Sequence, residues 1–307
     1  MKILVTGGAG FIGSHVVDAF IDAGHQVVVA DNLSTGHREN LHPKAIFYQL
    51  DICSPSLAGV FEKERPEVVD HHAAQVDVRR SVAEPLFDAE VNVIGSLNLL
   101  ENSVRYGVRK FIYISSGGAV YGEPQYLPCD EAHPINPLCP YGVTKHIIEH
   151  YLYLYRQNYD LRYLIFRYAN VYGPRQDPNG EAGVVAIFGG HMLRGEKLVI
   201  NGSGAQERDF VYVGDCARAN LIGLEQGEGI YNLGVGIGTS INEIFRRLKA
   251  ITGYSQEPVY GPAKLGETFR IYTDASKARR ELGWEPTVGL DEGLWHTVDY
   301  LRQQSAD

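Results

Sequence analysis

The chain has 307 residues, of which 44% are hydrophobic and 21% are charged, and its formal net charge is −9. The length favours about two domains, and the composition is typical of a soluble globular protein with a substantial core. The charge argues against a polybasic membrane anchor and a nonspecific nucleic-acid binder, because both need a basic surface. No apolar run approaches the roughly 18 residues of a membrane span, so we expect a cytoplasmic protein without a signal peptide.

The first part of the chain alternates short β-rich runs with helical patterns. Strands are expected over residues 2–6, 26–30, 45–50, 68–73, 110–115 and 162–168, and helices at about 13–23, 85–106 and 141–158. The strands are apolar almost without a break, as in parallel sheets that are covered by helices on both faces. Residues 1–168 are therefore expected to form a doubly wound α/β domain of the Rossmann type.

The pattern changes after about residue 170. Stretches with glycine and proline at 173–183 and glycine at 201–204 precede short elements and expected helices near 240–252, 275–282 and 291–303. No long polar linker separates the two parts. We expect residues 169–307 to form a smaller α/β lobe, with some segments returning to the first domain.

A glycine-rich turn between the first strand and the first helix carries the first chemical signal. Gly7, Gly10 and Gly13 give the pattern G-x-x-G-x-x-G. Such glycines allow a tight turn and let the backbone approach a pyrophosphate at the helix N-terminus. Asp31 follows at roughly the usual spacing of 20 residues, where a carboxylate binds a ribose diol and repels a 2′-phosphate. We therefore expect NAD rather than NADP, with the nearby Arg38 as a reservation.

Tyr141 and Lys145 form the pattern Y-x-x-x-K within the third expected helix. Side chains four residues apart share one face of a helix. A lysine ammonium beside a phenol favours the phenolate form. We therefore expect Lys145 to lower the pKa of Tyr141 and to make it a usable general base.

Further sequence blocks extend these patterns along nearly the whole chain. They are TGGAGFIGSH at 6–15, DNLSTG at 31–36, HAAQ at 72–75, SSGGAVYGE at 115–123, PYGVTK at 140–145, RYANVYGPRQ at 167–176 and RDFVYVGD at 208–215. Together they resemble the extended short-chain dehydrogenase/reductase family, and within it the UDP-glucose (UDP-galactose) 4-epimerases. The resemblance implies an NAD-dependent enzyme that interconverts two UDP-sugars through a transient 4-keto sugar and NADH.

The resemblance also implies roles for residues at matching positions. Tyr141 would take the proton from the sugar 4-hydroxyl, and Lys145 would also hold the nicotinamide ribose. The implied cofactor contacts are Gly7, Gly10, Phe11, Ile12, Gly13, Asp31, Asn32, Ser34, Thr35, Gly36, Asp51, Ile52, Ala73, Ala74, Gln75, Asn92, Tyr141, Lys145 and Tyr168. The implied substrate contacts are Ser116, Asn170, Arg208 and Lys264, and the planar fork of Arg208 suits a diphosphate.

The third catalytic hydroxyl departs from the family's usual pattern. A Ser or Thr is expected three residues before the valine of V-Y-G, and Gly117 stands at that place. We expect Ser116, which precedes Gly117 and Gly118, to supply the hydroxyl, with Ser115 as the alternative. The same segment argues against a 4,6-dehydratase, because Gly118 and Ala119 stand where that relative carries an Asp-Glu pair.

The motifs discriminate poorly among sugar-nucleotide substrates. An epimerase of UDP-N-acetylhexosamine or of a UDP-uronate, or a reductase on the same scaffold, stays open as an alternative. A non-catalytic NAD-sensing module is a remote one. By analogy with the family, the two long helices at 85–106 and 141–158 predict a homodimer.

No metal site is expected. The segment from His146 to His150 matches the zinc-peptidase pattern H-x-x-E-H. On a helical wheel its histidines point away from Tyr141 and Lys145, which favours a solvated or subunit-facing pair. The four cysteines are scattered without a C-x-x-C pattern, as is typical of a reducing compartment.

Overall fold

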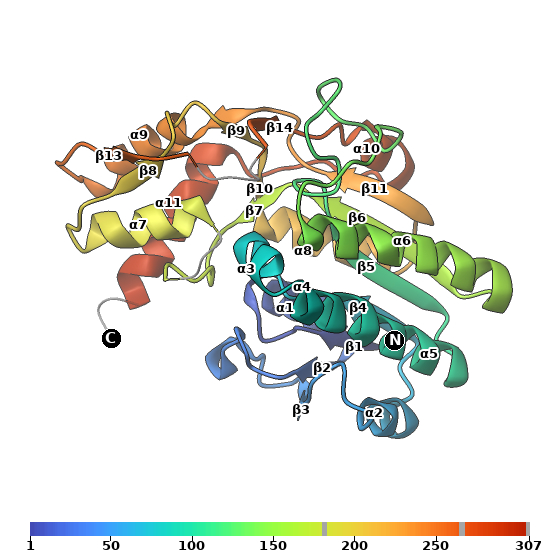
Figure 1. Ribbon diagram of the computed structural model, residues 1–307. Helices are drawn as coiled ribbons and strands as arrows, with labels where there is room; N and C mark the ends of the chain where they lie inside the picture. The colour runs from blue at the N-terminus through green and yellow to red at the C-terminus, as the bar shows by residue number, and fades with distance from the viewer. Residues whose placement is uncertain (180–182, 264–267, 305–307) are drawn as a thin grey trace.

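A seven-stranded, entirely parallel sheet forms the centre of the computed structural model, which describes residues 1–179, 183–263 and 268–304 (Figure 1). Its order is β11-β6-β5-β4-β1-β2-β3. The strands are β1 (Lys2–Thr6), β2 (Gln26–Asp31), β3 (Ile46–Gln49), β4 (Val68–His71), β5 (Lys110–Ser116), β6 (Arg162–Tyr168) and β11 (Gly229–Leu233). The expected doubly wound, Rossmann-type sheet is confirmed, and six of its strands lie where the sequence predicts them.

Helices cover both faces of this sheet, because successive residues of each strand point to opposite sides. Ile3 and Val5 of β1 pack into one core, and Leu4 between them packs into the other. The first core is closed by α1 (Phe11–Asp22), α8 (Val213–Gly223) and α10 (Ser276–Leu282), and the second by α2 (Leu57–Glu64), α5 (Gly95–Arg105) and α6 (Pro140–Tyr159). Two buried faces explain why the strands read as continuous apolar runs.

The helix expected over 85–106 is interrupted. It consists of α4 (Pro85–Ala89), a π-helical turn η2 (Glu90–Ile94) and α5, and it is preceded by α3 (Val78–Ala83). A π-helical turn holds one extra residue, so it rotates the side chains that follow relative to those before it. Apolar periodicity does not reveal such a turn. Asn92, an expected cofactor contact, lies within it.

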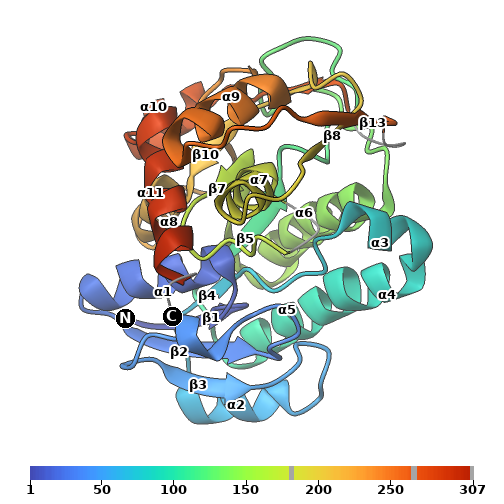
Figure 2. The same cartoon turned by 90° about the vertical axis from the view of Figure 1, so that its left-hand side faces the viewer.

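Three helices form the core of the smaller lobe. They are α7 (Val184–Leu193), α9 (Ile241–Thr252) and α11 (Leu290–Gln304). Short strand pairs complete it: β7 (Asn170–Tyr172) with β10 (Phe210–Tyr212), β8 (Val199–Asn201) with β13 (Val259–Gly261), and β9 (Glu207–Arg208) with β12 (Thr239–Ser240) and β14 (Arg270–Ile271). In Figures 1 and 2 this group lies at the opposite end of the molecule from β2 and β3.

The chain crosses between the two parts more than once. From beyond residue 169, β11 pairs in parallel with β6, and α8 and α10 pack on the first core. The sequence predicted neither α7 nor α8. Helix α7 is apolar on nearly every side, so it lacks the amphipathic period by which a helix is recognised. None of the helices in the described ranges is long and apolar enough to cross a membrane.

Candidate active site

The glycine turn between β1 and α1 is packed too closely for side chains. A Cβ added at Gly13 would lie 2.3 Å from the carbonyl oxygen of Gly7, and one added at Gly7 would lie 2.7 Å from the backbone nitrogen of Ala73. Gly7 also has a φ of 69°, a conformation that favours glycine. Gly10 caps α1 without a side-chain hydrogen bond, so the first-turn N–H groups are left for an anionic ligand. The turn therefore fits a dinucleotide pyrophosphate.

Asp31 ends β2 and is hydrogen-bonded to this turn. Its Oδ2 accepts from the N–H of Ala9 at 3.0 Å, and its Oδ1 accepts from that of Leu33 at 2.8 Å. Each carboxylate oxygen has a second lone pair, so Asp31 is also able to accept hydrogen bonds from ribose hydroxyls. The guanidinium of Arg38 donates instead to Gln49 at 2.8 Å. This arrangement fits the adenosine ribose of NAD.

Asn32 and Asp51 form a hydrogen-bonded pair directly after β2 and β3. The Nδ2 of Asn32 donates to Asp51 at 2.8 Å, and the N–H of Cys53 donates to the same carboxylate at 2.8 Å. Burial would raise the pKa of Asp51, but these hydrogen bonds outweigh it and lower the pKa. Asn32 in turn accepts from the N–H of Ser34 at 3.0 Å, which shapes the loop that continues through Thr35 and Gly36.

Tyr141 and Lys145 lie near the start of α6, next to the end of β5. Pro140 occupies the first turn of the helix, where its missing N–H costs nothing. The Lys145 ammonium is 4% exposed and donates to the carbonyl oxygen of Ile114 at 3.0 Å. It lies 6.0 Å from the centroid of the Tyr141 ring and 5.1 Å from that of Tyr113. The structure therefore brings the two Y-x-x-x-K residues together on one face, as predicted.

The expectation that Lys145 lowers the pKa of Tyr141 is wrong. Burial raises the pKa of Tyr141, and a hydrogen bond with Ser116 offsets this rise only in part. Burial also lowers the pKa of Lys145 to about 8. The ammonium therefore loses its proton before the phenol would, and a neutral amine does not favour a phenolate. Sequence spacing showed the proximity of the pair but not the burial of its lysine.

Ser116 and Ser115, the two candidates for the catalytic hydroxyl, face different partners. The Ser116 hydroxyl acts on Tyr141, whose pKa it lowers against the effect of burial. The Ser115 hydroxyl donates to Glu149, two turns further along the same helix, at 2.7 Å in a buried contact. The geometry thus places Ser116, not Ser115, beside the proposed base.

The Gly117–Gly118 pair lets the chain turn sharply after Ser116. The N–H of Val120 donates back to the Ser116 carbonyl at 3.1 Å. A Cβ at Gly117 would lie 3.0 Å from the methyl group of Thr273, so a side chain has little room there. One residue on, Ala119 approaches α6 closely, since a Cβ at Gly142 would lie 2.6 Å from its carbonyl oxygen. These close approaches hold the Ser116 turn against the Tyr141 helix.

Gln75 and Asn92 are joined beside the same helix. The N–H of Gln75 donates to Asn92 Oδ1 at 2.8 Å, and Asn92 Nδ2 donates to the Gln75 carbonyl at 3.0 Å. Both side chains also donate to Asp88, which accepts a third hydrogen bond from Thr144 of α6 at 2.8 Å. Asp88 is fully buried. Sequence reasoning missed it because an acidic residue four positions before Asn92 has no motif of its own.

The expected substrate residues lie on the lobe side of the Ser116 turn. Arg208 of β9 is in register with Ile271 of β14, and Ile271 packs on Val120 just after the turn. The Arg208 guanidinium donates to the carbonyl oxygens of Glu207 and Phe269, at 2.9 and 3.3 Å. Asn170 begins β7 and is exposed. Tyr168 is buried, and its hydroxyl accepts a hydrogen bond from Asn220. Lys264 lies outside the described residues.

The H-x-x-E-H segment serves a buried ion pair. Glu149 accepts from the guanidinium of Arg167 at 2.5 and 2.9 Å, and His146 Nδ1 lies 2.9 Å from the same carboxylate. The Nε2 atoms of His146 and His150 are 3.1 Å apart. Within the described ranges, no three His, Cys, Asp or Glu side chains are grouped as a metal site would need.

Two aspartates of the RDFVYVGD block hold the lobe together. Asp209 is 1% exposed and accepts from the N–H groups of Val235, Gly236 and Thr273, at 2.8 to 3.2 Å. Asp215 accepts from the N–H of Thr287 at 3.0 Å and from its hydroxyl at 2.7 Å. The block therefore contains two structural aspartates as well as Arg208, the expected substrate contact. The sequence alone did not distinguish these two roles.

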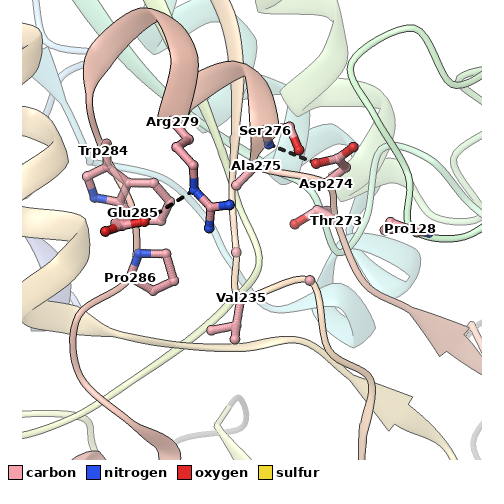
Figure 3. Close-up of a pocket in the computed structure, with 12 residues that line it drawn as sticks. Pro128, Val235, Thr273, Asp274, Ala275, Ser276, Arg279, Trp284, Glu285 and Pro286 are labelled. Carbon is pink, nitrogen blue, oxygen red and sulfur yellow. Dashed lines mark hydrogen bonds and ion pairs between the residues drawn. The ribbon is translucent and has the colours of Figure 1, made fainter.

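A cavity of about 330 Å³ lies beside the loop that follows β11, and Val235, Gly236 and Thr273 line part of it (Figure 3). Arg279 Nε in its wall pairs with Glu285 at 3.2 Å, and Asp274 accepts from the N–H of Ser276 at 2.8 Å. Each of these charged groups therefore already has a partner. None of the expected site residues lines it.

Comparisons with known proteins agree with this geometry. The model of the NAD dependent epimerase/dehydratase family matches residues 3–234. The UDP-glucose 4-epimerase of Mycolicibacterium smegmatis is 45% identical over 312 residues, which cover 99% of this chain and 100% of that protein. A crystal structure of UDP-glucose 4-epimerase from Thermotoga maritima with UDP-glucose is 52% identical, with a TM-score of 0.98 over 99% of this chain and 100% of that one. The UDP-glucose 4-epimerase of Thermus thermophilus in complex with NAD is 43% identical, with a TM-score of 0.95 over 98% and 99% of the two chains. The chain therefore belongs to the NAD dependent epimerase/dehydratase family.

Proposed function

We propose that the chain is an NAD-dependent UDP-glucose 4-epimerase that interconverts UDP-galactose and UDP-glucose. The observation that carries this proposal is the grouping of Ser116, Tyr141 and Lys145 at the end of β5. A glycine turn that leaves no space for side chains lies at the end of β1 in the same sheet. The likeness to epimerase structures with UDP-glucose or NAD, over almost the whole chain, supports the substrate and the cofactor.

The residues divide the reaction between them. When bound, NAD supplies the hydride acceptor and donor at C4 of the sugar. Tyr141 takes the proton of the 4-hydroxyl as hydride leaves, and it returns the proton after the 4-keto sugar has turned over. Ser116 donates a hydrogen bond to the reacting oxygen. Lys145 holds the nicotinamide ribose, and its ammonium lies 6.0 Å from the centroid of the Tyr141 ring. The alternative epimerases named from the sequence would use the same groups and differ in the sugar.

The nucleotide end of the substrate is negatively charged. Because the chain as a whole is acidic, it needs positively charged side chains next to that end. We assign this task to Arg208, whose guanidinium forms a planar fork suited to phosphate oxygens, with help from Asn170 and Lys264. The contacts from Arg208 to the Glu207 and Phe269 carbonyls fix the side chain at the edge of the lobe. The cytoplasmic location stays a prediction.

One assay tests the proposed activity. Purified protein is incubated with UDP-galactose and no added cofactor, and the products are separated by chromatography. We expect UDP-glucose. Absence of this product, with turnover of a UDP-N-acetylhexosamine or a UDP-uronate in parallel tubes, would show that the sugar has been assigned wrongly. No turnover of any UDP-sugar, even with added NAD, would leave the non-catalytic module.

Ser116→Ala is expected to lower epimerase turnover about 100-fold, because one hydrogen-bond donor to the reacting oxygen is lost. Ser115→Ala is the matched control: it removes the hydroxyl that donates to Glu149. We expect it to cost about 1 kcal/mol of stability and to leave most of the turnover. Steady-state rates and thermal melts separate the two effects. A greater loss of turnover in Ser115→Ala would reverse the assignment of the hydroxyl.

A homodimer is proposed on the exposed side of α6. Val143, Ile147 and Leu154 are 44%, 38% and 47% exposed and lie along one side of the helix. Aliphatic side chains so exposed mark surfaces that other protein covers. We expect light scattering to give twice the mass of the chain, and Ile147→Glu to give the mass of one chain. A monomeric wild-type protein would contradict the proposal.

A further inference from the structure

Asp88 is a fully buried carboxylate that sits between the cofactor side and the Y-x-x-x-K helix. Its Oδ2 accepts from the Thr144 hydroxyl at 2.8 Å, and its Oδ1 accepts from the amide groups of Gln75 and Asn92, at 2.8 and 3.2 Å. All three partners donate, so both oxygens act as acceptors. Because each partner is itself held in place, the negative charge of Asp88 is fixed at this point of the structure.

The three partners come from three separate elements. Thr144 precedes Lys145 on α6, Gln75 lies in the loop after β4, and Asn92 lies in the π-helical turn η2. Thr144 also accepts a hydrogen bond from Asn92 at 3.2 Å. Asp88 therefore ties the helix that carries the proposed base to two of the expected cofactor contacts. A displacement of the loop after β4 or of the turn η2 would therefore also shift α6.

Lys145 has a neutral hydrogen-bond partner. The residue is 4% exposed, and its ammonium donates to the carbonyl oxygen of Ile114. The groups that face it are Tyr141 of its own helix, Tyr113 of β5 and His71 of β4. Burial, followed by the charge of Lys145, lowers the pKa of His71, so the imidazole is neutral at physiological pH.

Asp88 matters because its charge affects the pH at which Lys145 loses its proton. Burial lowers the pKa of Lys145 to about 8, and among the described residues the opposing influence is the charge of Asp88. If the lysine lost its proton near neutral pH, Tyr141 would have no positive neighbour when it takes the substrate's proton. A negative charge that keeps the lysine protonated thus extends the pH range over which the base works.

We propose that Asp88 is a positioning residue of the epimerase site: its hydrogen bonds to Thr144, Gln75 and Asn92 set the place of α6, and its buried charge is the counter-charge of Lys145 on that helix. The kinetic consequence rests on the proposed function. The protonation of Lys145 does not, and it is measured independently of any turnover.

The experiment compares Asp88→Asn with two controls in pH profiles of kcat. Asp88→Asn removes the charge with little change of shape, so we expect the alkaline limb of the profile to move down by about one pH unit. Thr144→Val removes the hydrogen bond but keeps the carboxylate of Asp88. We therefore expect kcat to fall while the alkaline limb of its pH profile stays at the wild-type position. Glu90→Gln removes an exposed carboxylate two residues further along the chain, and both values should match the wild type.

The titration of Lys145 is followed in parallel by NMR of protein labelled at the lysine ε-carbons, with Lys145→Arg to assign its signal. We expect a lower midpoint in Asp88→Asn and an unchanged midpoint in Thr144→Val. A lower kcat at every pH, with limb and midpoint unmoved, would reduce Asp88 to a structural role and overturn the proposal. Should Asp88→Asn fail to fold, Asp88→Glu keeps the charge and displaces the hydrogen bonds. A lower kcat with an unchanged midpoint then supports the proposal, and a lower midpoint overturns it.

A wild-type protein that turns over no UDP-sugar would refute the proposed function while leaving the NMR comparison intact. The two failures are therefore distinguishable.

Discussion

Replacing Tyr141 with phenylalanine should lower epimerase turnover by a factor of about 10²–10⁴, the usual contribution of a general acid–base group. The substitution removes one oxygen, the phenolic oxygen whose pKa Ser116 lowers. The ring stays, so the packing of α6 and the position of Lys145 should be kept. Turnover is measured with UDP-galactose, and bound NAD is released by denaturation and quantified.

Tyr153→Phe is the matched control for this substitution. Tyr153 lies on the same helix but is 54% exposed. We expect its variant to match the wild type in turnover and in NAD content. If Tyr141→Phe retained more than a tenth of the wild-type turnover, another group would have to act as the base. If it lost its NAD as well, the effect would be on binding and would say nothing about proton transfer.

The sequence predicted those parts of the fold that depend on local pattern. The apolar runs of β1 to β6, the glycine pattern and the Y-x-x-x-K pattern could be recognised in the sequence, because each depends only on nearby residues. The strand β11 is different, since its place beside β6 depends on a chain segment from beyond residue 169. The π-helical turn at Asn92 is also invisible, because one extra residue in a turn leaves the apolar count nearly unchanged.

The site shows the same division between pattern and context. The pairing of Tyr141 with Lys145 follows from helix geometry, and the choice of Ser116 over Ser115 was open until the structure showed the partner of each hydroxyl. The direction of the pKa shift of Tyr141 could not be read from spacing. It depends first on how deeply Tyr141 itself is buried, and the charge of Asp88 adds to the rise.

Gly13→Ala sets two effects of opposite sign against each other in the cofactor turn. Gly13 is the third residue of α1, where alanine is favoured over glycine by about 1 kcal/mol. Its φ lies outside the left-handed region, so an alanine there is not strained by backbone conformation. Against this, the new Cβ would lie 2.3 Å from the Gly7 carbonyl oxygen and 2.9 Å from its carbon.

The clash should win, because its partner is backbone and has no rotamer by which to move away. Relieving it means shifting Gly7, whose own Cβ position is already blocked by the backbone of Ala73. Overpacking of this kind costs about 1–3 kcal/mol, so we expect a net loss of stability. The N–H groups that cradle the pyrophosphate move with the turn, and bound NAD should therefore fall well below one per chain. Thermal melts and NAD extraction measure the two effects.

Gly59→Ala isolates the helix contribution. Gly59 lies in the exposed part of α2, and no atom lies within 4 Å of its added Cβ. We expect this variant to gain about 0.5–1 kcal/mol of stability and to keep its NAD. If Gly13→Ala behaved in the same way, the turn would be loose enough to take a side chain. The glycine at residue 13 would then be unnecessary for the pyrophosphate, and the cofactor site would have to be placed elsewhere.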